Sequence, residues 1–148
     1  MRMNYTMMGD TVNLAARLES SAKQYGVYNF VGENLYEKTK DVYIFRLLDF
    51  VRVKGKNIPV KVYELISSKE NIDNHTINLI KTFEDGLDHY YLQNWEKALA
   101  LFKKSESMED HFSGRNTTPS NVYIDRCIMF KESPPGKDWN GVWTMTSK

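Results

Sequence analysis

The sequence predicts an α+β fold followed by an α-helical hairpin extension, and two patterns carry this prediction. In residues 1–66, apolar runs alternate with segments of helical composition in the order strand, helix, strand, helix, strand, strand. This order alone also fits an α/β layer arrangement. From residue 76 onward, apolar residues recur at helical spacing instead. We therefore expect a layered unit over 1–66, a linker over 67–75, a helical region over 76–131 and an extended tail over 132–148.

The first predicted strand is the run MRMNYTMMG, which ends in a tight turn at Gly9. A helix should follow at once, with Asp10 as its N-cap and its end near Gly26. The first strand has no partner before it, and the layered unit supplies few strands. We therefore expect the chain to start in the middle of a domain.

The remaining elements of the layered unit follow from composition. A buried strand is predicted for VYNFVG and a short helix for ENLYEKTK. Two long strands are predicted for YIFRLLDFVRV and PVKVYEL, which flank the turn KGKNI.

The helical region should contain two antiparallel helices joined near Gln93 and Asn94, and a third helix opened by Pro119. The apolar faces of the first two helices are Ile80, Phe83, Leu87 and Tyr90, then Trp95, Ala98, Leu99 and Phe102. In the tail, Trp139 and Trp143 flank an Asn-Gly turn, so we expect this segment to dock as a small ribbon or lid.

Composition narrows the classes of function. The chain has 20 Lys and Arg against 19 Asp and Glu, and its formal charge is +1, so it lacks the basic footprint of a nucleic-acid binder. One cysteine, Cys127, excludes an internal disulfide, and the three histidines do not have the spacing of a zinc site. We expect a buried thiol, no nucleic-acid partner and no metal ligands in this chain.

The segment GDTVNLAARLES carries the most informative pattern. Asn13 and Arg17 are four residues apart, so on a helix they project from the same face and can share one ligand. An arginine offers several fixed donors to phosphate oxygens, and an asparagine can both donate and accept at a sugar. From the residues alone, the alternative is a surface arginine paired with Glu19 and a solvated asparagine.

The segment YTMMGDTVNLAARLES resembles the signature of class III nucleotide cyclases, the adenylate and guanylate cyclase family. The later segment FRLLDFVRVKGKNIPVKVYEL is similar to the strand, Val-Lys-Gly turn and returning strand that end the same catalytic domain. The resemblance covers residues 1–66 and implies the C-terminal half of that domain, an incomplete ferredoxin-like cyclase sheet. It also implies cyclisation of a nucleoside triphosphate, with release of pyrophosphate.

The resemblance implies a role for four residues. Arg17 matches the arginine that stabilises charge on the phosphoryl oxygens in the transition state, and Asn13 matches the asparagine that orients the ribose. Lys54 matches the lysine that holds the terminal phosphates. Thr6 falls where the family reads the purine. Asp10 is expected to cap the helix and not to act as a catalytic acid.

A threonine at the purine-reading position marks a subgroup of adenylate cyclases, and its hydroxyl can accept from an adenine amino group. We therefore expect ATP as the substrate that Thr6 reads. A hydroxyl can also donate, which leaves GTP open.

The resemblance implies two Mg²⁺ or Mn²⁺ ions whose aspartate ligands lie in the first half of the family domain. We expect this chain alone to be inactive, and the complete site to form in a dimer. Unpaired sheet edges also predict self-association. We expect this chain to be cytoplasmic. The longer parent protein can in addition be tethered to a membrane through its N-terminal region.

Gly86, Trp95, Ala98 and Phe102 have spacings that resemble one tetratricopeptide helical hairpin. A single hairpin cannot bury both faces, so it must rest on the cyclase-like half, on the tail or on another chain. These aromatic residues either form a core or line a groove for a protein partner. The rival function is therefore a non-catalytic interaction module derived from a cyclase.

Overall fold

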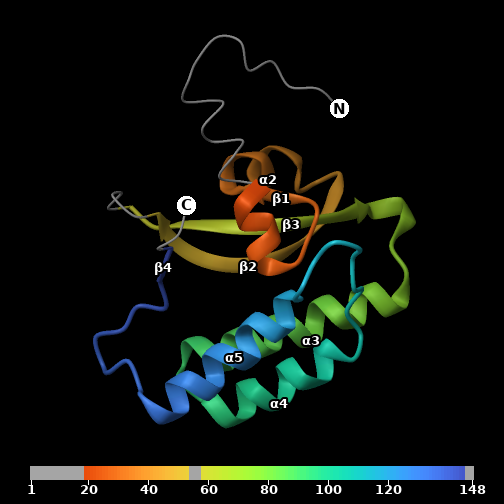
Figure 1. Ribbon diagram of the computed structural model, residues 1–148. Helices are drawn as coiled ribbons and strands as arrows, with labels where there is room; N and C mark the ends of the chain where they lie inside the picture. The colour runs from red at the N-terminus through yellow and green to blue at the C-terminus, as the bar shows by residue number, and fades with distance from the viewer. Residues whose placement is uncertain (1–18, 54–57, 146–148) are drawn as a thin grey trace.

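A computed structural model describes residues 19–53 and 58–145 and shows a β-sheet between two layers of helices (Figure 1). The helical residues 19–25 approach α5, because the hydroxyls of Tyr25 and Tyr123 bond to the same carboxylate, that of Asp49. Helix α2 (Glu33–Thr39) lies on one side of the sheet. Helices α3, α4 and α5 lie on the other side. The described part of the chain is thus a mixed α and β structure.

The sheet contains four strands among the described residues: β1 (Phe30–Gly32), β2 (Tyr43–Val53), β3 (Val60–Ser68) and β4 (Trp143–Met145). Their spatial order is β1-β3-β2-β4. Strand β3 is antiparallel to both β1 and β2, whereas β4 runs parallel to β2. The two long strands predicted from alternating apolar residues are confirmed as β2 and β3.

Strand β1 is shorter than the predicted run 27–32, because the chain is still leaving the preceding helix there. Gly26 has a φ of +76°, a conformation that favours glycine. The backbone N–H of Val27 donates to the carbonyl of Ala22 at 3.0 Å. Pairing with β3 therefore begins only at Phe30.

The helices of this half agree with the sequence where they can be compared. The segment ENLYEKTK forms α2, and the helical residues 19–25 end before the turn at Gly26, as predicted. The predicted helix start at Asp10 and the strand before it lie outside the described residues.

Helices α3 (Asn74–Tyr91) and α4 (Trp95–Glu106) confirm the two helices predicted from apolar spacing. The side chain of Asp73 caps α3 by accepting the backbone N–H of Thr76 at 2.8 Å. The short connection contains Gln93 with a φ of 64°. This left-handed residue reverses the chain at the predicted place.

Helix α5 (Pro119–Glu132) begins with a proline in its first turn, as predicted. The hydroxyl of Thr118 accepts the backbone N–H of Asn121 at 3.1 Å and caps the helix.

None of the helices in the described residues is both long enough and apolar enough to cross a membrane.

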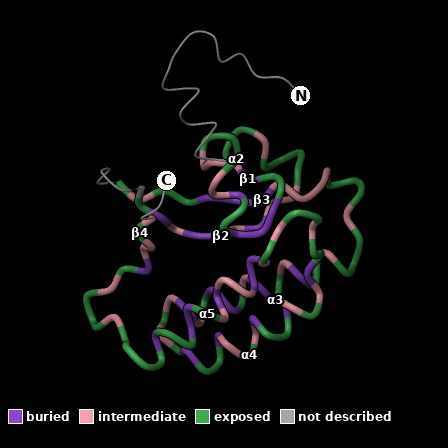
Figure 2. Tube along the Cα trace, in the orientation of Figure 1, coloured by how far each residue is buried: buried purple, intermediate pink, exposed green. Residues whose placement is uncertain are grey.

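Two apolar clusters form the core, and burial follows the inner faces of the elements (Figure 2). One cluster lies between α3, α4 and α5 and consists of Phe83, Leu87, Tyr90, Trp95, Ala98, Phe102, Tyr123, Cys127 and Phe130. The cluster around the helical residues 19–25 consists of Ala22, Tyr25, Val27, Phe30, Leu48, Val51 and Val62. Val122 and Trp143 pack against both clusters, so the helices rest on the sheet and on the tail.

The tail docks onto both the helices and the sheet. The Trp139 ring lies 5.3 Å from the ring of Tyr90 and 5.5 Å from that of Trp95, centroid to centroid. After a turn at Gly141, with φ +84°, residues Trp143–Met145 pair with β2. The segment predicted to dock as a ribbon or lid therefore becomes the fourth strand of the sheet.

The turn at Gly26 tests the close contact between this turn and the loop before α5. A Cβ at Gly26 would overlap the backbone carbonyl of Thr117, whereas Gly114, with φ +78°, has open space around its Cα. We expect Gly26→Ala to lower the free energy of unfolding by about 3 kcal/mol and Gly114→Ala by about 1 kcal/mol, since both are strained but only one also clashes. Urea denaturation of both variants measures this difference, and equal losses would contradict the observed contact.

Candidate functional site

The four residues predicted to form the nucleotide site are not placed by the structure. Thr6, Asn13, Arg17 and Lys54 all lie outside the described residues. Their roles remain predictions, and so does the role of Asp10 as a cap.

The chain segments next to these positions do have a defined place. The helical residues 19–25 follow Arg17 in the sequence, and β2 ends at Val53, directly before Lys54. Ala22 of the helical residues and Val51 of β2 belong to the same apolar cluster. The two candidate segments therefore leave from one common core.

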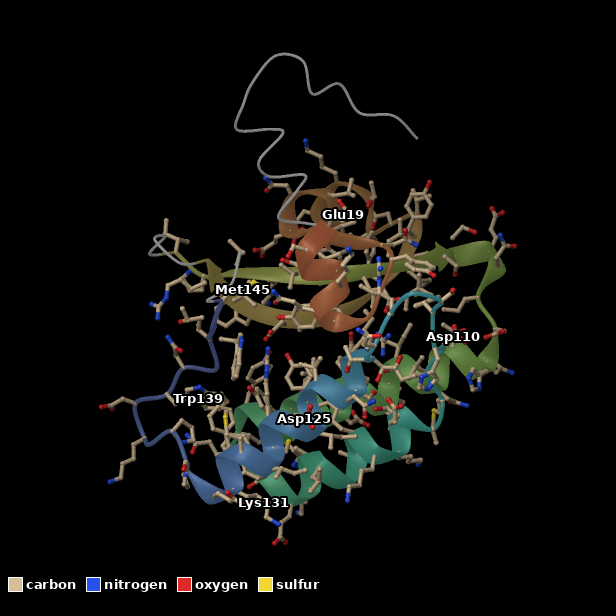
Figure 3. All side chains as sticks on the ribbon, viewed as in Figure 1. Glu19, Asp110, Asp125, Lys131, Trp139 and Met145 are labelled. Atoms are coloured by element: carbon tan, nitrogen blue, oxygen red, sulfur yellow. The ribbon has the colours of Figure 1, made fainter. Side chains whose placement is uncertain are left out.

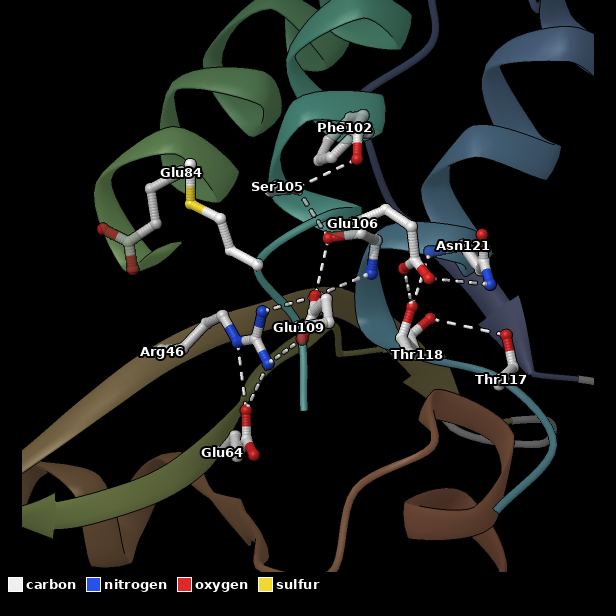
Figure 4. A network of polar contacts seen from close by, with 12 residues as sticks. Arg46, Glu64, Glu84, Phe102, Ser105, Glu106, Glu109, Thr117, Thr118 and Asn121 are labelled. Atoms are coloured by element: carbon white, nitrogen blue, oxygen red, sulfur yellow. Dashed lines mark hydrogen bonds and ion pairs between the residues drawn. The ribbon is translucent and has the colours of Figure 1, made fainter. Parts of the chain in front are cut away.

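A buried ionic cluster around Arg46 joins the sheet to the helical layer (Figure 4). Arg46 of β2 donates from Nη2 to Oε1 of Glu64 in β3 at 2.6 Å, and from Nη1 to Oε2 of Glu109 at 2.8 Å. The guanidinium also stacks on the ring of Phe83 in α3, 4.8 Å from its centroid. All three charged side chains are buried, so this is an arginine held between two carboxylates away from water.

The cluster extends into the start of α5. The Oε2 atom of Glu109 accepts the hydroxyl of Ser120 at 2.6 Å and its backbone N–H at 3.1 Å. The Ser120 hydroxyl also lies 2.6 Å from the hydroxyl of Ser105 in α4. Nearby, Glu106 accepts the hydroxyl of Thr118, the residue that caps α5. These bonds satisfy the buried carboxylates and fix the loop between α4 and α5.

Burial and charge oppose each other within the Arg46 cluster. Burial raises the pKa of Glu64, and the neighbouring Arg46 counteracts this rise. Burial also disfavours the charge of Arg46, but Glu64 and Glu109 together raise its pKa above the ordinary value. The arginine therefore stays charged, and the cluster acts as a structural contact between layers.

A second buried cluster centres on Asp49 of β2, whose side chain is fully buried. Its Oδ1 accepts the hydroxyl of Tyr123 and the backbone N–H of Phe50, both at 2.8 Å. Its Oδ2 accepts Nη2 of Arg126 at 2.8 Å and the hydroxyl of Tyr25. Desolvation and the Asp49 charge raise the pKa of Tyr25 well above its ordinary value, so this hydroxyl stays a donor.

Neither Arg46 nor Asp49 was predicted as a functional residue, and the backbone of β2 explains why. Regular alternation would put positions 46 and 49 on opposite faces of a strand. The register of β2 against β3 shifts between Leu47 and Asp49, a β-bulge or similar irregularity. Both charged side chains consequently reach the helical layer. The available signal was the charged residues Arg46 and Asp49 between apolar residues in the middle of the strand.

Two hollows open on the described surface. The larger has a volume of about 580 Å³ and lies between α2, the start of β2 and α3. Lys40, Lys69 and Lys81 line it together with isoleucines and three carboxylates. The smaller, about 350 Å³, is lined by residues of the helix 19–25, α5 and β4, including Tyr25, Arg126 and Trp143. Neither hollow is lined by the three charged residues of the Arg46 cluster.

No group of three or more His, Cys, Asp or Glu side chains that could hold a metal ion occurs within the described part of the chain. Cys127 is buried, and desolvation raises the pKa of its thiol to about 12. This thiol has the properties of a core residue and not of a nucleophile.

Comparison with known proteins shows similarity to adenylate cyclases. Over 133 residues the chain is 33% identical to "Adenylate cyclase, terminal-differentiation specific" of Dictyostelium discoideum, a match that covers 86% of the chain and 6% of that protein. It is 38% identical over 65 residues to "Adenylate cyclase 1" of Rhizobium meliloti, covering 44% of the chain and 10% of that protein. A third relative, "Adenylate cyclase" of Anabaena cylindrica, is 36% identical over 67 residues, covering 43% and 13%.

The chain therefore contains a cyclase-related region and covers 6%, 10% and 13% of the lengths of these three relatives. A match covering 86% of the chain must include both the long strands and most of the helical layer. No family model matches the chain, and no solved structure matches it significantly.

The Arg46 cluster generates a direct stability prediction. Arg46→Met leaves the buried carboxylates of Glu64 and Glu109 without their shared counter-charge, and we expect a loss of about 3–5 kcal/mol in the free energy of unfolding. The matched control is Arg52→Met on the same strand, where the side chain is exposed and donates to the hydroxyl of Thr144 in β4, with an expected change below about 0.5 kcal/mol. Chemical denaturation measures both, and a similar small loss in the two variants would contradict a cluster that ties the layers together.

Proposed function

We propose that this chain contributes one side of the nucleotide site of a class III adenylate cyclase, which converts ATP to cyclic AMP and pyrophosphate for signalling inside the cell. The observation that carries the proposal is the similarity to three proteins named adenylate cyclase, two of them over less than half of the chain. The Gly-Asp-x-Val-Asn-x-Ala-x-Arg motif and the Val-Lys-Gly turn fall within the resemblance to that family.

The core around Ala22 and Val51 supports a shared site. Arg17 is five residues before Ala22, and Lys54 is three residues after Val51. Even a fully extended chain limits the Cα atoms of these residues to within about 18 Å and about 11 Å of their anchors, at about 3.6 Å per residue. Both anchors lie in one apolar cluster, so these limits keep the two candidate residues in one region of the protein and are compatible with a single triphosphate between them.

In the proposed reaction, the ribose 3′-hydroxyl releases its proton to solvent and its oxygen bonds to the α-phosphorus, while the bond from that phosphorus to the bridging oxygen breaks and pyrophosphate leaves. Arg17 stabilises the negative charge that develops on the α-phosphoryl oxygens. Asn13 orients the ribose, so that its hydroxyl is aligned with the phosphorus. Lys54 holds the terminal phosphates as a compact positive charge.

Thr6 is proposed to read the base. Its hydroxyl can accept a hydrogen bond from the adenine amino group, which favours ATP. GTP is the alternative substrate, because the same hydroxyl can donate to the guanine carbonyl.

Two Mg²⁺ or Mn²⁺ ions supply electrostatic stabilisation in the proposed enzyme, and the family places their aspartate ligands in the first half of the domain. We therefore propose that this chain acts together with such a half, in the parent protein or in a dimer, and is inactive by itself.

Complementation tests this function. The chain is mixed with the N-terminal half of a related cyclase domain and given ATP or GTP separately, with Mg²⁺ or Mn²⁺. We expect cyclic AMP from the mixture only, and a loss of about 100-fold or more with Arg17→Ala, as for removal of a transition-state donor. The matched control is Lys23→Ala, an exposed cation of the helix 19–25, which should leave the rate unchanged.

Cyclic GMP in place of cyclic AMP would correct the assignment of the base. Normal activity of Arg17→Ala would contradict its role in the reaction. Absence of product in every combination would favour the alternative, in which the chain is a non-catalytic module for protein interaction.

A further inference from the structure

The carboxylate of Asp49 connects the helical residues 19–25 to α5 on one face of the sheet. It lies on β2 and accepts the hydroxyl of Tyr25, the last helical residue before the turn at Gly26. It also accepts Tyr123 and Arg126 from α5. Figure 3 places Glu19 at the start of the helical residues 19–25, away from Asp125 of α5. A single buried carboxylate thus bonds to the end of one helix and the middle of another.

Arg126 is the only cation whose ion pair with Asp49 is observed within the described residues. Its side chain is 6% exposed, and its guanidinium lies between aromatic rings, 3.8 Å from the centroid of Trp143 and 4.8 Å from that of Tyr123. Both rings fix the plane of the guanidinium and exclude water. Because the Asp49 side chain is buried, water does not reach its charge, and Arg126 compensates this charge instead.

The same end of the helix is held at a second point. The Gly26 turn lies against the backbone of Thr117, and Nε of Arg115 donates to the carbonyl of Val27 at 2.8 Å. The segment 115–126 therefore contacts the last helical residue and the two residues after it.

We propose that Arg126 is a positioning residue for the nucleotide site, acting through Asp49 and Tyr25 on the orientation of the helix that includes residues 19–25. The inference rests on the proposed function, in which Asn13 and Arg17 precede these residues. The helical layer is then part of the cyclase machinery, since α5 sets the orientation of the helix that ends before the turn at Gly26.

The physical reason is the cost of a buried charge. Without Arg126, the Asp49 carboxylate must take up a proton or admit water, and either event changes its bond to Tyr25. The end of the helix then loses its fixed partner. A displacement of about 1 Å at a catalytic group can cost about 100-fold in rate.

Hydrogen exchange on the chain itself tests the structural part of this proposal. We expect Arg126→Met to speed amide exchange in residues 19–25 at least about tenfold more than in α4, which serves as the internal reference. The double variant Asp49→Asn with Arg126→Met removes both charges and should restore slow exchange, because the amide introduced at position 49 is neutral and its oxygen still accepts from Tyr123. Lys131→Met, an exposed cation near the end of α5, is the matched control.

The complementation assay tests the catalytic part. We expect kcat of Arg126→Met to fall at least about tenfold with KM within about twofold, at a temperature where circular dichroism shows the variant folded, and the double variant to recover most of the loss. Unchanged exchange in residues 19–25, or a changed exchange with unchanged kcat, would overturn the proposal.

Failure of the proposed function and failure of the positioning role are distinguishable. If Arg17→Ala is fully active or no nucleotide is cyclised, the proposed function is wrong, and exchange still decides whether Arg126 orients the helix. If Arg126→Met does not fold, Arg126→Lys keeps the charge without the planar guanidinium. It should give a smaller rise in exchange confined to residues 19–25, and a rise spread equally over α4 would overturn the positioning role.

Discussion

The structure depends on the burial of charge between β2 and the helical layer. Asp49 and Arg46 both belong to β2. Asp49 pairs with Arg126. Arg46 pairs with Glu64 and Glu109. Buried ion pairs add little stability relative to apolar residues, but losing one partner is expensive. Such pairs specify which surfaces meet. They explain why α5 and the loop before it sit on this face of the sheet and in one register.

This arrangement gives the helical layer a different role from that of an independent appendage. The isolated helices α3, α4 and α5 would expose the aromatic cluster around Tyr90, which the tail and the sheet cover. The Dictyostelium relative matches 86% of the chain, which extends the similarity beyond the strands into these helices. The comparison and the packing agree that the two parts belong together. Whether they constitute separate domains, as the linker 67–75 predicts, stays a prediction.

Much of the fold follows from local sequence. The strands β2 and β3 were predicted because apolar, β-branched and aromatic residues recur along both, and α5 because Pro119 marks its start. The shortness of β1 was not predicted, since the residues before Phe30 serve the turn at Gly26. The pairing of β4 with β2 joins residues about ninety positions apart, which no local pattern encodes.

The site was predicted less completely than the fold. Thr6, Asn13, Arg17 and Lys54 came from the resemblance to cyclases and lie outside the described residues. The buried clusters escaped sequence analysis because an irregularity near Leu48 overturns the alternation on which strand faces are assigned. Only long-range contacts reveal that Asp49 meets Arg126.

Native-state hydrogen exchange in low denaturant tests the central claim, that buried charges unite the sheet and the helical layer in one cooperative unit. The amides of β3 and those of α3 should show opening free energies equal to within about 1 kcal/mol and the same denaturant dependence. A lower-energy opening of α3, α4 and α5 that leaves β2 and β3 protected would contradict it, because the helices would then be an independent attachment.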